Sequence, residues 1–374
     1  MGELCNLVVE LDERFDGARA PADPAGVEIV PAARAGERVL AWIDAEFGGS
    51  WSSEAHASVS ALALRDGAPV GFASFDPRGL RFRWLRGLAR LPGVGVFGPF
   101  GVAAGERGRG IGRALLHRAL RGLRERGYTR ALIAAVSDDR LVEYYARAAG
   151  ARVAERFDWA ALTAPRPRVT LMASGSGTNV QAVLDRAADG RLPIDVVATV
   201  VNAERAYAAQ RARDAGVARV TSAVWDKRRE SRAQYDDRLL HCVREDAPDL
   251  VLLLGWMHLL DETFVRAFPE LLNVHPAYLP LDPARDDVGL PDGTRIPAFR
   301  GARAVRDALS AGSPWTGATV HRVTPSTDRG PVMTRKPLKV GRGEDEAAVT
   351  ARLHPVEHEL VAGAIRRWLY ERDG

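Results

Sequence analysis

Residues 168–179 have the sequence RVTLMASGSGTN, in which an apolar segment runs into a loop of small residues and then into a helical pattern. The apolar segment predicts a strand, and Thr178 and Asn179 can cap the helix that follows. The backbone amides of Gly175, Gly177 and Thr178 would then face an anion at the helix N-terminus. This stretch therefore predicts a strand, an anion-binding loop and a helix.

The same alternation continues downstream of this stretch. The apolar patterns predict further elements, namely helices over 180–188, 203–215 and 231–244 and strands over 195–201 and 250–254. Parallel strands need crossover connections of this length. The C-terminal half is therefore expected to be a Rossmann-like, doubly wound α/β domain with a parallel sheet.

The first 165 residues predict a different mixed α/β sheet domain. The expected elements are a helix over 32–47, a hairpin of 61–64 and 70–75, a strand over 94–102, a helix over 111–126 that ends at Gly127, a strand over 131–136 and a helix over 141–149. Pro165 and Pro167 separate the two patterns, so we place domains at 1–165 and 166–374. A chain of 374 residues is about twice the size of a common domain, which agrees with this division.

The composition excludes several classes of protein. Of the 52 basic residues 49 are arginine, against 48 acidic residues, so the pI of about 9.3 reflects residue choice and no nucleic-acid partner is expected. Cys5 and Cys242 cannot form a disulfide framework or a four-thiolate zinc site, which fits a cytoplasmic protein without a metal. The longest apolar segment, 251–260, is about half a membrane span, so neither membrane insertion nor secretion is expected.

A glycine-rich loop, RGRGIG at 107–112, lies between an apolar strand and an amphipathic helix. Its backbone amides can converge on one anion, and the helix N-terminus adds partial positive charge. With this loop and the helix EYYAR at 143–147, the segment from about 27 to 160 resembles the GNAT acyltransferases. The resemblance implies that acetyl-CoA, or another acyl-CoA, places its pyrophosphate on Arg107, Gly108, Arg109, Gly110, Ile111 and Gly112.

By the same resemblance, a tyrosine near the end of that helix is the general acid for the departing thiolate, and Tyr145 is the best match. Four residues separate Tyr145 from Gly150 where three are usual in the family, so which of Tyr144 and Tyr145 points into the core is open. Glu106 and Asp138 are candidate bases only by their closeness in sequence. Five arginines interleaved with aromatic residues are interpreted as a solvated hairpin beside an anionic cofactor rather than an RNA surface, namely Arg78, Arg81, Arg83, Arg86 and Arg90.

A second group of polar residues follows the strand pattern LLNVH at 271–275. Asn273 and His275 are two residues apart, so on a strand they point to the same side, at the end where doubly wound sheets bind ligands. The amide can donate to an oxyanion, and the imidazole can exchange a proton with an attacking amine. Asp328 supplies a carboxylate to hold the imidazolium. These are the parts needed for acyl transfer to nitrogen.

The motifs GSGTN at 175–179, NVHP at 273–276, TGATVH at 316–321 and DRGP at 328–331 make residues 167–370 resemble the folate-dependent formyltransferases, those acting on glycinamide ribonucleotide above all. The resemblance implies 10-formyltetrahydrofolate as donor and Asn273, His275 and Asp328 as catalytic residues. It also implies a pterin pocket lined by Leu254, Trp256, Met257, His258 and Leu259. The implied substrate-binding residues are Gly177, Thr178, Asn179 and Glu357.

The sequence departs from that family beside the expected site. Residues 281–298 insert several charged side chains before Phe299, and His354 and Pro355 replace other residues, so a changed acceptor pocket is expected. The leading interpretation is a bifunctional enzyme of specialised metabolism that formylates and acetylates a small-molecule amine, with a homodimer as one candidate assembly. The alternative is a glycinamide ribonucleotide formyltransferase of purine synthesis with a CoA-binding regulatory domain.

Overall fold

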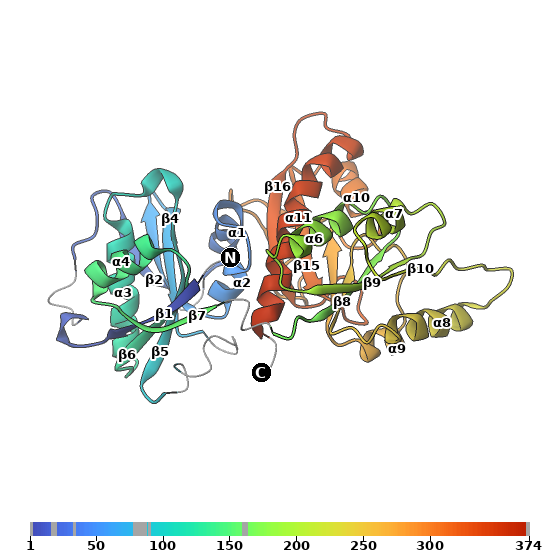
Figure 1. Ribbon diagram of the computed structural model, residues 1–374. Helices are drawn as coiled ribbons and strands as arrows, with labels where there is room; N and C mark the ends of the chain where they lie inside the picture. The colour runs from blue at the N-terminus through green and yellow to red at the C-terminus, as the bar shows by residue number, and fades with distance from the viewer. Residues whose placement is uncertain are drawn as a thin grey trace. The chain divides into compact units, whose positions relative to one another are not determined.

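The computed structural model describes residues 3–15, 21–32, 35–77, 88, 91–158 and 164–371. The chain divides into an N-terminal unit, Met1–Phe47 with Trp51–Leu162 and Trp368–Gly374, and a C-terminal unit, Gly48–Ser50 with Thr163–Arg367. Each unit has its own seven-stranded sheet (Figure 1). We predicted a boundary between two independently folding domains after residue 165. This boundary stays a prediction, because the division into compact units does not test independent folding.

The sheet of the N-terminal unit has the order β2-β3-β4-β5-β6-β1-β7, and only β5 and β6 pair in parallel. The helix predicted over 32–47 is shorter, because Ala32 belongs to a strand that pairs with β3 and Gly36 is the N-cap of the helix. The elements are β1 (Glu3–Glu10), β2 (Glu28–Ala32), α1 (Glu37–Glu46), α2 (Trp51–His56), β3 (Val59–Arg65), β4 (Ala68–Phe75), β5 (Val94–Val102), α3 (Ile111–Glu125), β6 (Arg130–Val136), α4 (Asp139–Ala149) and β7 (Arg152–Asp158).

Strand β1 lies between β6 and β7, the two strands that α4 connects. It is antiparallel to both, and Leu7 stands opposite Ile133 on one side and Val153 on the other. Leu7 and Val9 are buried in the core of the unit. The N-terminus, to which the sequence analysis assigned no element, therefore fills the gap between two strands of the sheet.

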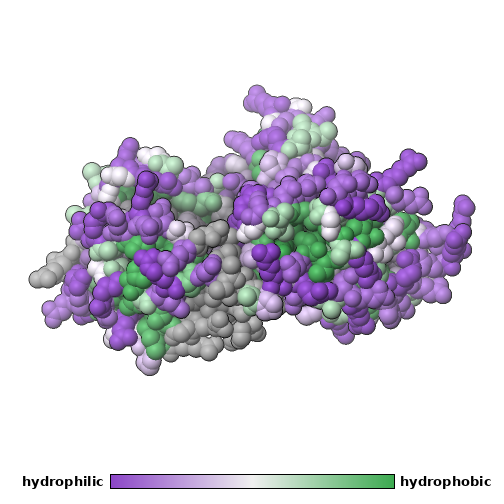
Figure 2. Space-filling view, in the orientation of Figure 1, coloured by the Kyte–Doolittle hydropathy of each residue, from purple (hydrophilic) through white to green (hydrophobic). Residues whose placement is uncertain are grey.

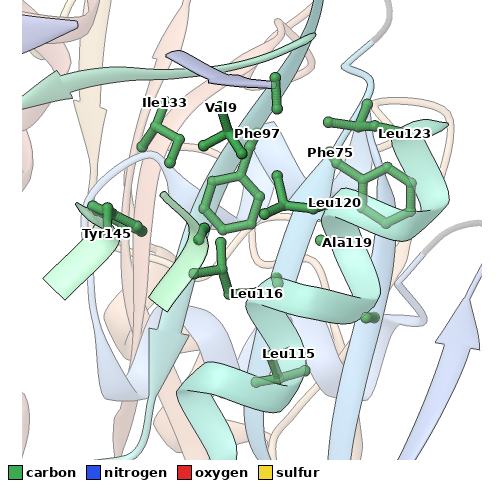
Figure 3. Close-up of a cluster of buried hydrophobic side chains, with 14 of the residues drawn as sticks. Val9, Phe75, Phe97, Leu115, Leu116, Ala119, Leu120, Leu123, Ile133 and Tyr145 are labelled. Atoms are coloured by element: carbon green, nitrogen blue, oxygen red, sulfur yellow. The ribbon is translucent and has the colours of Figure 1, made fainter. Parts of the chain in front are cut away.

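Helix α3 packs its leucine face against the sheet, as its spacing predicts. Leu115, Leu116 and Leu120 are at most 1% exposed and point toward side chains of the neighbouring strands (Figure 3). The close approach depends on Gly122, where a Cβ would lie 2.5 Å from the ring of Phe75 on β4. The helix thus fixes its own N-terminus, which carries the glycine-rich loop, relative to the sheet.

The C-terminal unit has the sheet order β10-β9-β8-β11-β12-β15-β16, and the predicted α/β class is confirmed. The five strands from β10 to β12 are parallel, as predicted, whereas β15 and β16 are antiparallel to their neighbours. The parallel sheet predicted from the segments up to residue 254 is thus extended by two antiparallel strands, and the short connection from β15 to β16 holds no crossover helix.

The bounds of the elements in this unit are β8 (Arg168–Ala173), α6 (Thr178–Ala188), β9 (Asp195–Val201), α7 (Tyr207–Asp214), β10 (Arg219–Ser222), α8 (Arg232–Arg244), β11 (Leu250–Leu253), α9 (Glu262–Ala267), β12 (Leu271–His275), β13 (Asp287–Gly289), β14 (Arg295–Pro297), α10 (Ala304–Ser310), β15 (Trp315–Arg322), β16 (Val332–Lys339) and α11 (Glu346–Glu371), whose residues from Trp368 onward belong to the N-terminal unit. Strands β13 and β14 form a separate two-stranded sheet.

Hydrophilic residues cover most of the face of the molecule in Figure 2. Among the described residues, none of the helices combines the length and the apolar character that crossing a membrane requires. The five arginines interpreted as a solvated hairpin, at positions 78 to 90, lie outside the described residues.

Replacing Leu7 by alanine tests the position of β1. Leu7 is 1% exposed, so Leu7→Ala should leave a cavity that costs about 3 kcal/mol, and amides of β1, β6 and β7 should exchange hydrogen faster. Hydrogen-exchange mass spectrometry measures this. The matched control is Val153→Ala, because Val153 is 41% exposed and pairs with Leu7. Equal exchange rates in the two variants would contradict the placement of β1.

Candidate active sites

The end of β12 brings Asn273 and His275 to one site, as predicted. Because β12 and β15 are antiparallel, Asn273 stands opposite His321 and His275 opposite Thr319. The Asn273 Nδ2 atom lies 3.2 Å from His321 Nε2. His321 is therefore a site residue that the sequence analysis quoted in a motif without giving it a role. Only the register between the two strands reveals its position.

Asp328 lies in the loop between β15 and β16 and contacts both imidazoles. Its Oδ2 atom is 3.5 Å from His275 Nδ1, and its Oδ1 atom is 3.4 Å from His321 Nε2. The Gly301 N–H donates to Asp328 Oδ2 at 2.7 Å. The structure thus gathers the three predicted catalytic side chains and adds His321 to them. Their catalytic role itself stays a prediction.

Burial and neighbouring charges give His275 and Asp328 different protonation states. His275 is 4% exposed, and burial lowers its pKa although Asp328 and a hydrogen bond to the Phe299 carbonyl at 2.8 Å act in the opposite direction. Burial by itself raises the pKa of Asp328, but its contacts with His321, His275 and the Gly301 amide outweigh burial and hold that pKa well below its usual value. At neutral pH the site therefore holds a neutral imidazole beside a carboxylate.

The loop after β8 opens a helix as predicted, but the expectation that Thr178 and Asn179 cap it was wrong, because Gly177 is the N-cap and no side chain caps the helix. Gly177 has a φ of 73° and a Cβ there would lie 2.6 Å from Ala208 Cα, so the close packing of this loop on α7 requires glycine. Asn179 Nδ2 donates to Glu357 Oε2 at 2.8 Å, which joins α6 to α11. Burial raises the pKa of Glu357. The four predicted substrate-binding residues, Gly177, Thr178, Asn179 and Glu357, are therefore close together.

A cation that the sequence analysis did not single out lies beside this loop. Arg211 of α7 donates from Nε to the Ser176 carbonyl at 2.9 Å and from Nη1 to Gln181 Oε1 at 3.2 Å. It places positive charge next to the free amides at the start of α6. The arrangement suits an anionic group of a substrate.

The five residues predicted to line the pterin pocket divide into two groups. Leu254 and Trp256 are 4% and 8% exposed, and the ring of His258 lies 5.8 Å from that of Tyr235, so these three side chains face the core. Met257 and Leu259 are 57% and 70% exposed. Two large apolar side chains open to solvent at a strand end can contact an apolar ligand. The pocket prediction therefore depends on the backbone of this loop and these two side chains.

In the N-terminal unit, the predicted CoA loop opens α3. Gly108 and Gly110 have φ values of 78° and 83°, and neither would meet a close neighbour if it carried a Cβ, so the loop is open on its outer side. Ile111 anchors the helix start in the core. The backbone amides at this end of α3 can receive a pyrophosphate. The residues from Arg107 to Gly112 thus have the geometry that the resemblance implies, while CoA binding stays a prediction.

The sheet of this unit is forked next to the loop. Strands β5 and β6 pair only as far as Phe97 and Ile133, although both continue beyond these residues. Tyr145 is 6% exposed, and its ring centroid lies 6.2 Å from that of Phe97 and 6.4 Å from that of Phe100 (Figure 3). The Tyr145 ring therefore contacts β5 at the fork, where the two strands separate.

The neighbouring Tyr144 takes a different position. Its hydroxyl lies against Gly112 of the loop, 3.2 Å from where a Cβ would be, and within the described part of the chain this buried hydroxyl has no hydrogen-bond partner. Burial raises the pKa of Tyr144 to about 12 and also raises that of Tyr145. Both hydroxyls therefore stay protonated at neutral pH, as a proton donor must.

The two acidic residues named as candidate bases have structural partners instead. Glu106 accepts from Arg65 Nη2 at 2.9 Å, which lowers its pKa and makes it a weak base. Asp138 accepts from the Arg140 N–H at 2.8 Å and caps α4. Neither carboxylate is therefore poised to deprotonate an amine.

The C-terminal unit is a doubly wound domain with an Asn–His–Asp group, and the N-terminal unit has a forked sheet with a glycine-rich helix start. This combination is typical of a transferase with two acyl-transfer domains. The comparisons with known proteins agree with this class. The formyl transferase family matches residues 167–281 and 294–365, and the GNAT acetyltransferase family matches residues 30–151. The chain belongs to the formyl transferase family and carries a GNAT acetyltransferase domain before it.

Several relatives are phosphoribosylglycinamide formyltransferases. The chain is 33% identical to that of Escherichia coli K12 over 193 residues, which cover 51% of this chain and 82% of the relative. It is 35% identical to that of Mycobacterium tuberculosis H37Rv over 199 residues, which cover 53% of this chain and 83% of the relative. Among solved structures, glycinamide ribonucleotide transformylase 1 from Symbiobacterium toebii matches with 33% identity and a TM-score of 0.48, covering 55% of this chain and 88% of that one.

Two glycines of the loop after β8 give a matched test of its shape. Gly177→Ala should lower the free energy of unfolding by about 2 kcal/mol, because the left-handed backbone and the backbone of Ala208 both oppose a Cβ. Gly175→Ala is the control, since a Cβ at Gly175 meets nothing within 4 Å. Urea unfolding measures both. A loss of stability as large at position 175 as at position 177 would refute this account of the loop.

Proposed function

We propose that this chain is a bifunctional enzyme that acylates small-molecule amines in specialised metabolism. The C-terminal unit would transfer a formyl group from 10-formyltetrahydrofolate, and the N-terminal unit would transfer an acetyl group from acetyl-CoA. The observation that carries the proposal is the group formed by Asn273, His275 and Asp328 at the end of β12. The forked sheet beside the loop that opens α3 supports the second activity.

In the formyl transfer, the side chains would divide the work as follows. The amine attacks the formyl carbon, and Asn273 Nδ2 donates to the formyl oxygen as negative charge develops there. His275, neutral because burial lowers its pKa, accepts the proton that the amine loses. Asp328 stays ionised and stabilises the resulting imidazolium. The folate nitrogen leaves and recovers the proton, so that no covalent enzyme intermediate forms.

Alanine variants at the two positions of β12 test this scheme. Asn273→Ala and His275→Ala should each lower turnover by about 10²-fold, because one removes the oxyanion donor and the other the base. Mass spectrometry of a panel of amines with 10-formyltetrahydrofolate identifies the acceptor, and release of tetrahydrofolate gives the rate. Wild-type turnover should fall as the pH drops through the pKa of His275. Near-normal turnover in either variant would rule out the assigned roles.

Two adjacent tyrosines test the acetyl transfer. We propose Tyr145 as the proton donor to the CoA thiolate because its ring lies at the fork of β5 and β6. Tyr145→Phe should lower CoA release by about 10²-fold, whereas Tyr144→Phe, the matched control, should keep a rate close to wild type. A thiol-detecting assay measures the release. If calorimetry shows that acetyl-CoA binds and no amine elicits CoA release, this unit is a binding module instead.

A second candidate function is glycinamide ribonucleotide formyl transfer, with the N-terminal unit as a CoA-binding regulatory domain. The contact between Asn179 and Glu357 favours it, because it keeps the predicted substrate-binding residues together. Turnover of glycinamide ribonucleotide with 10-formyltetrahydrofolate at ordinary enzyme rates would establish this function. Absence of turnover would reject it.

The proposed setting is the cytoplasm, and the proposed assembly is a homodimer. The two cysteines are free thiols, Cys5 buried and Cys242 partly buried, which suits a reducing compartment. Analytical ultracentrifugation of the full chain measures the assembly.

A further inference from the structure

Residues 282–293 lie outside both segments that the formyl transferase family matches, yet they form a defined structure. They include β13, which pairs with β14 in a hairpin. Val288, Leu290 and Ile296 are at most 3% exposed, so the hairpin is anchored by its own apolar side chains. Trp315 Nε1 donates to Asp292 Oδ2 at 2.8 Å and ties the hairpin to β15. We call residues 282–297 the insert hairpin.

One carboxylate of the insert hairpin holds two arginines. Asp286 Oδ1 accepts from Arg300 Nη1 at 3.0 Å and also from Arg329 Nη2. Both guanidinium groups also donate to backbone carbonyls of the insert hairpin. Arg300 donates to the Arg285 carbonyl at 2.7 Å, and Arg329 donates to the Pro283 carbonyl at 2.9 Å. Asp286 therefore links two arginines that come from different parts of the chain.

Both arginines are next to Asp328 or to the group that binds it. Arg329 follows Asp328 directly in the chain, and Arg300 Nε donates to the Asp328 carbonyl at 3.2 Å. Arg300 also precedes Gly301, whose N–H donates to Asp328 Oδ2. Two contacts, through Arg300, therefore lead from the Asp286 carboxylate to the backbone carbonyl of Asp328, the residue whose carboxylate faces His275 and His321.

Asp328 needs such support because its backbone is strained. Its φ is 51°, in the left-handed region that is costly for a residue with a side chain. Gly330 adds a second constraint, since a Cβ there would lie 1.7 Å from the Arg322 carbonyl oxygen. A loop held in such a conformation keeps its shape only when its surroundings fix it.

We propose that Asp286 is a positioning residue, which holds Arg300 and Arg329 so that the Asp328 carboxylate stays directed at His275 and His321. The proposal rests on the proposed function, in which Asp328 is the catalytic carboxylate. It gives a role in formyl transfer to the insert hairpin, most of which lies outside the segments that the formyl transferase family matches. Asp286 itself is 75% exposed in its side chain, so its ion pairs add little to overall stability.

The experiment reads the imidazole of His275 directly, by NMR of the full chain with ¹⁵N-labelled histidine and assignment by His275→Gln. The charged and titratable groups that face His275 are Asp328, His321 and Arg300. The negative charge of Asp328 raises the pKa of His275, so a displaced Asp328 should lower it. Asp286→Ala should therefore lower the pKa of His275 by about half a unit or more.

Further variants make the comparison specific. Asp287→Ala is the matched control, because Asp287 also binds two arginines, Arg285 at 2.9 Å and Arg295 at 2.8 Å, but both belong to the insert hairpin. It should leave the pKa of His275 unchanged. Asp286→Glu keeps the charge and should restore most of the wild-type titration. If the alanine variant fails to fold, Asp286→Asn provides the comparison, because it removes the charge at nearly the same size and should also lower the pKa of His275.

Turnover gives a second readout with the acceptor found by the amine panel. Asp286→Ala should lower kcat about tenfold with little change in KM for the folate donor, because the folate-contacting loop is untouched. A His275 titration in Asp286→Ala equal to that of wild type and of Asp287→Ala would overturn the proposal. The NMR result stands even if the wild-type chain transfers no formyl group, so failure of the proposed function is recognised separately.

Discussion

The pairing of β12 with β15 is the contact on which the C-terminal site depends. It places Asn273 opposite His321 and His275 opposite Thr319, so side chains almost fifty residues apart in the chain meet with a defined spacing. A shift of one residue would turn each of these side chains to the other face of the sheet. At its end β12 pairs only with β15, where His275 stands opposite the buried Thr319, so the register also contributes to the burial that lowers the pKa of His275.

Both units contain the same local arrangement, which has the geometry to suit an anionic ligand. In each, a strand precedes a loop that ends in a left-handed glycine, and this glycine is the N-cap of the helix that follows. What differs is the surrounding constraint. Gly177 is packed against Ala208, whereas Gly108 and Gly110 are open to their surroundings. The shape of the loop after β8 is therefore fixed by its packing on α7. The shape of the loop before α3 depends on its own glycines and on the buried Ile111.

Most of the local structure could be predicted from the sequence, and so could the site residues that are close together in the chain. Helix α3 followed from its leucines and from the glycine that ends it, and Asn273 and His275 followed from their spacing on a strand. His321 could not be assigned because its role depends on strand register. Strand β1 was missed because its neighbours, β6 and β7, are far away in sequence. The antiparallel β15 and β16 were missed because the predicted alternation ended at residue 254, and no helix lies between these two strands.

The position of β1 also has a consequence for the synthesis of the protein. The strand is translated before both of its neighbours, β6 and β7, which follow much later in the chain at Arg130–Val136 and Arg152–Asp158. Until residues 130–158 have been translated, Leu7 and Val9 have no partner strand and must wait as an apolar segment exposed to other chains. Closing this sheet therefore requires contacts of long sequence separation, which form slowly. Strand β1 is thus made before both of its partners and can be paired only after they have been translated.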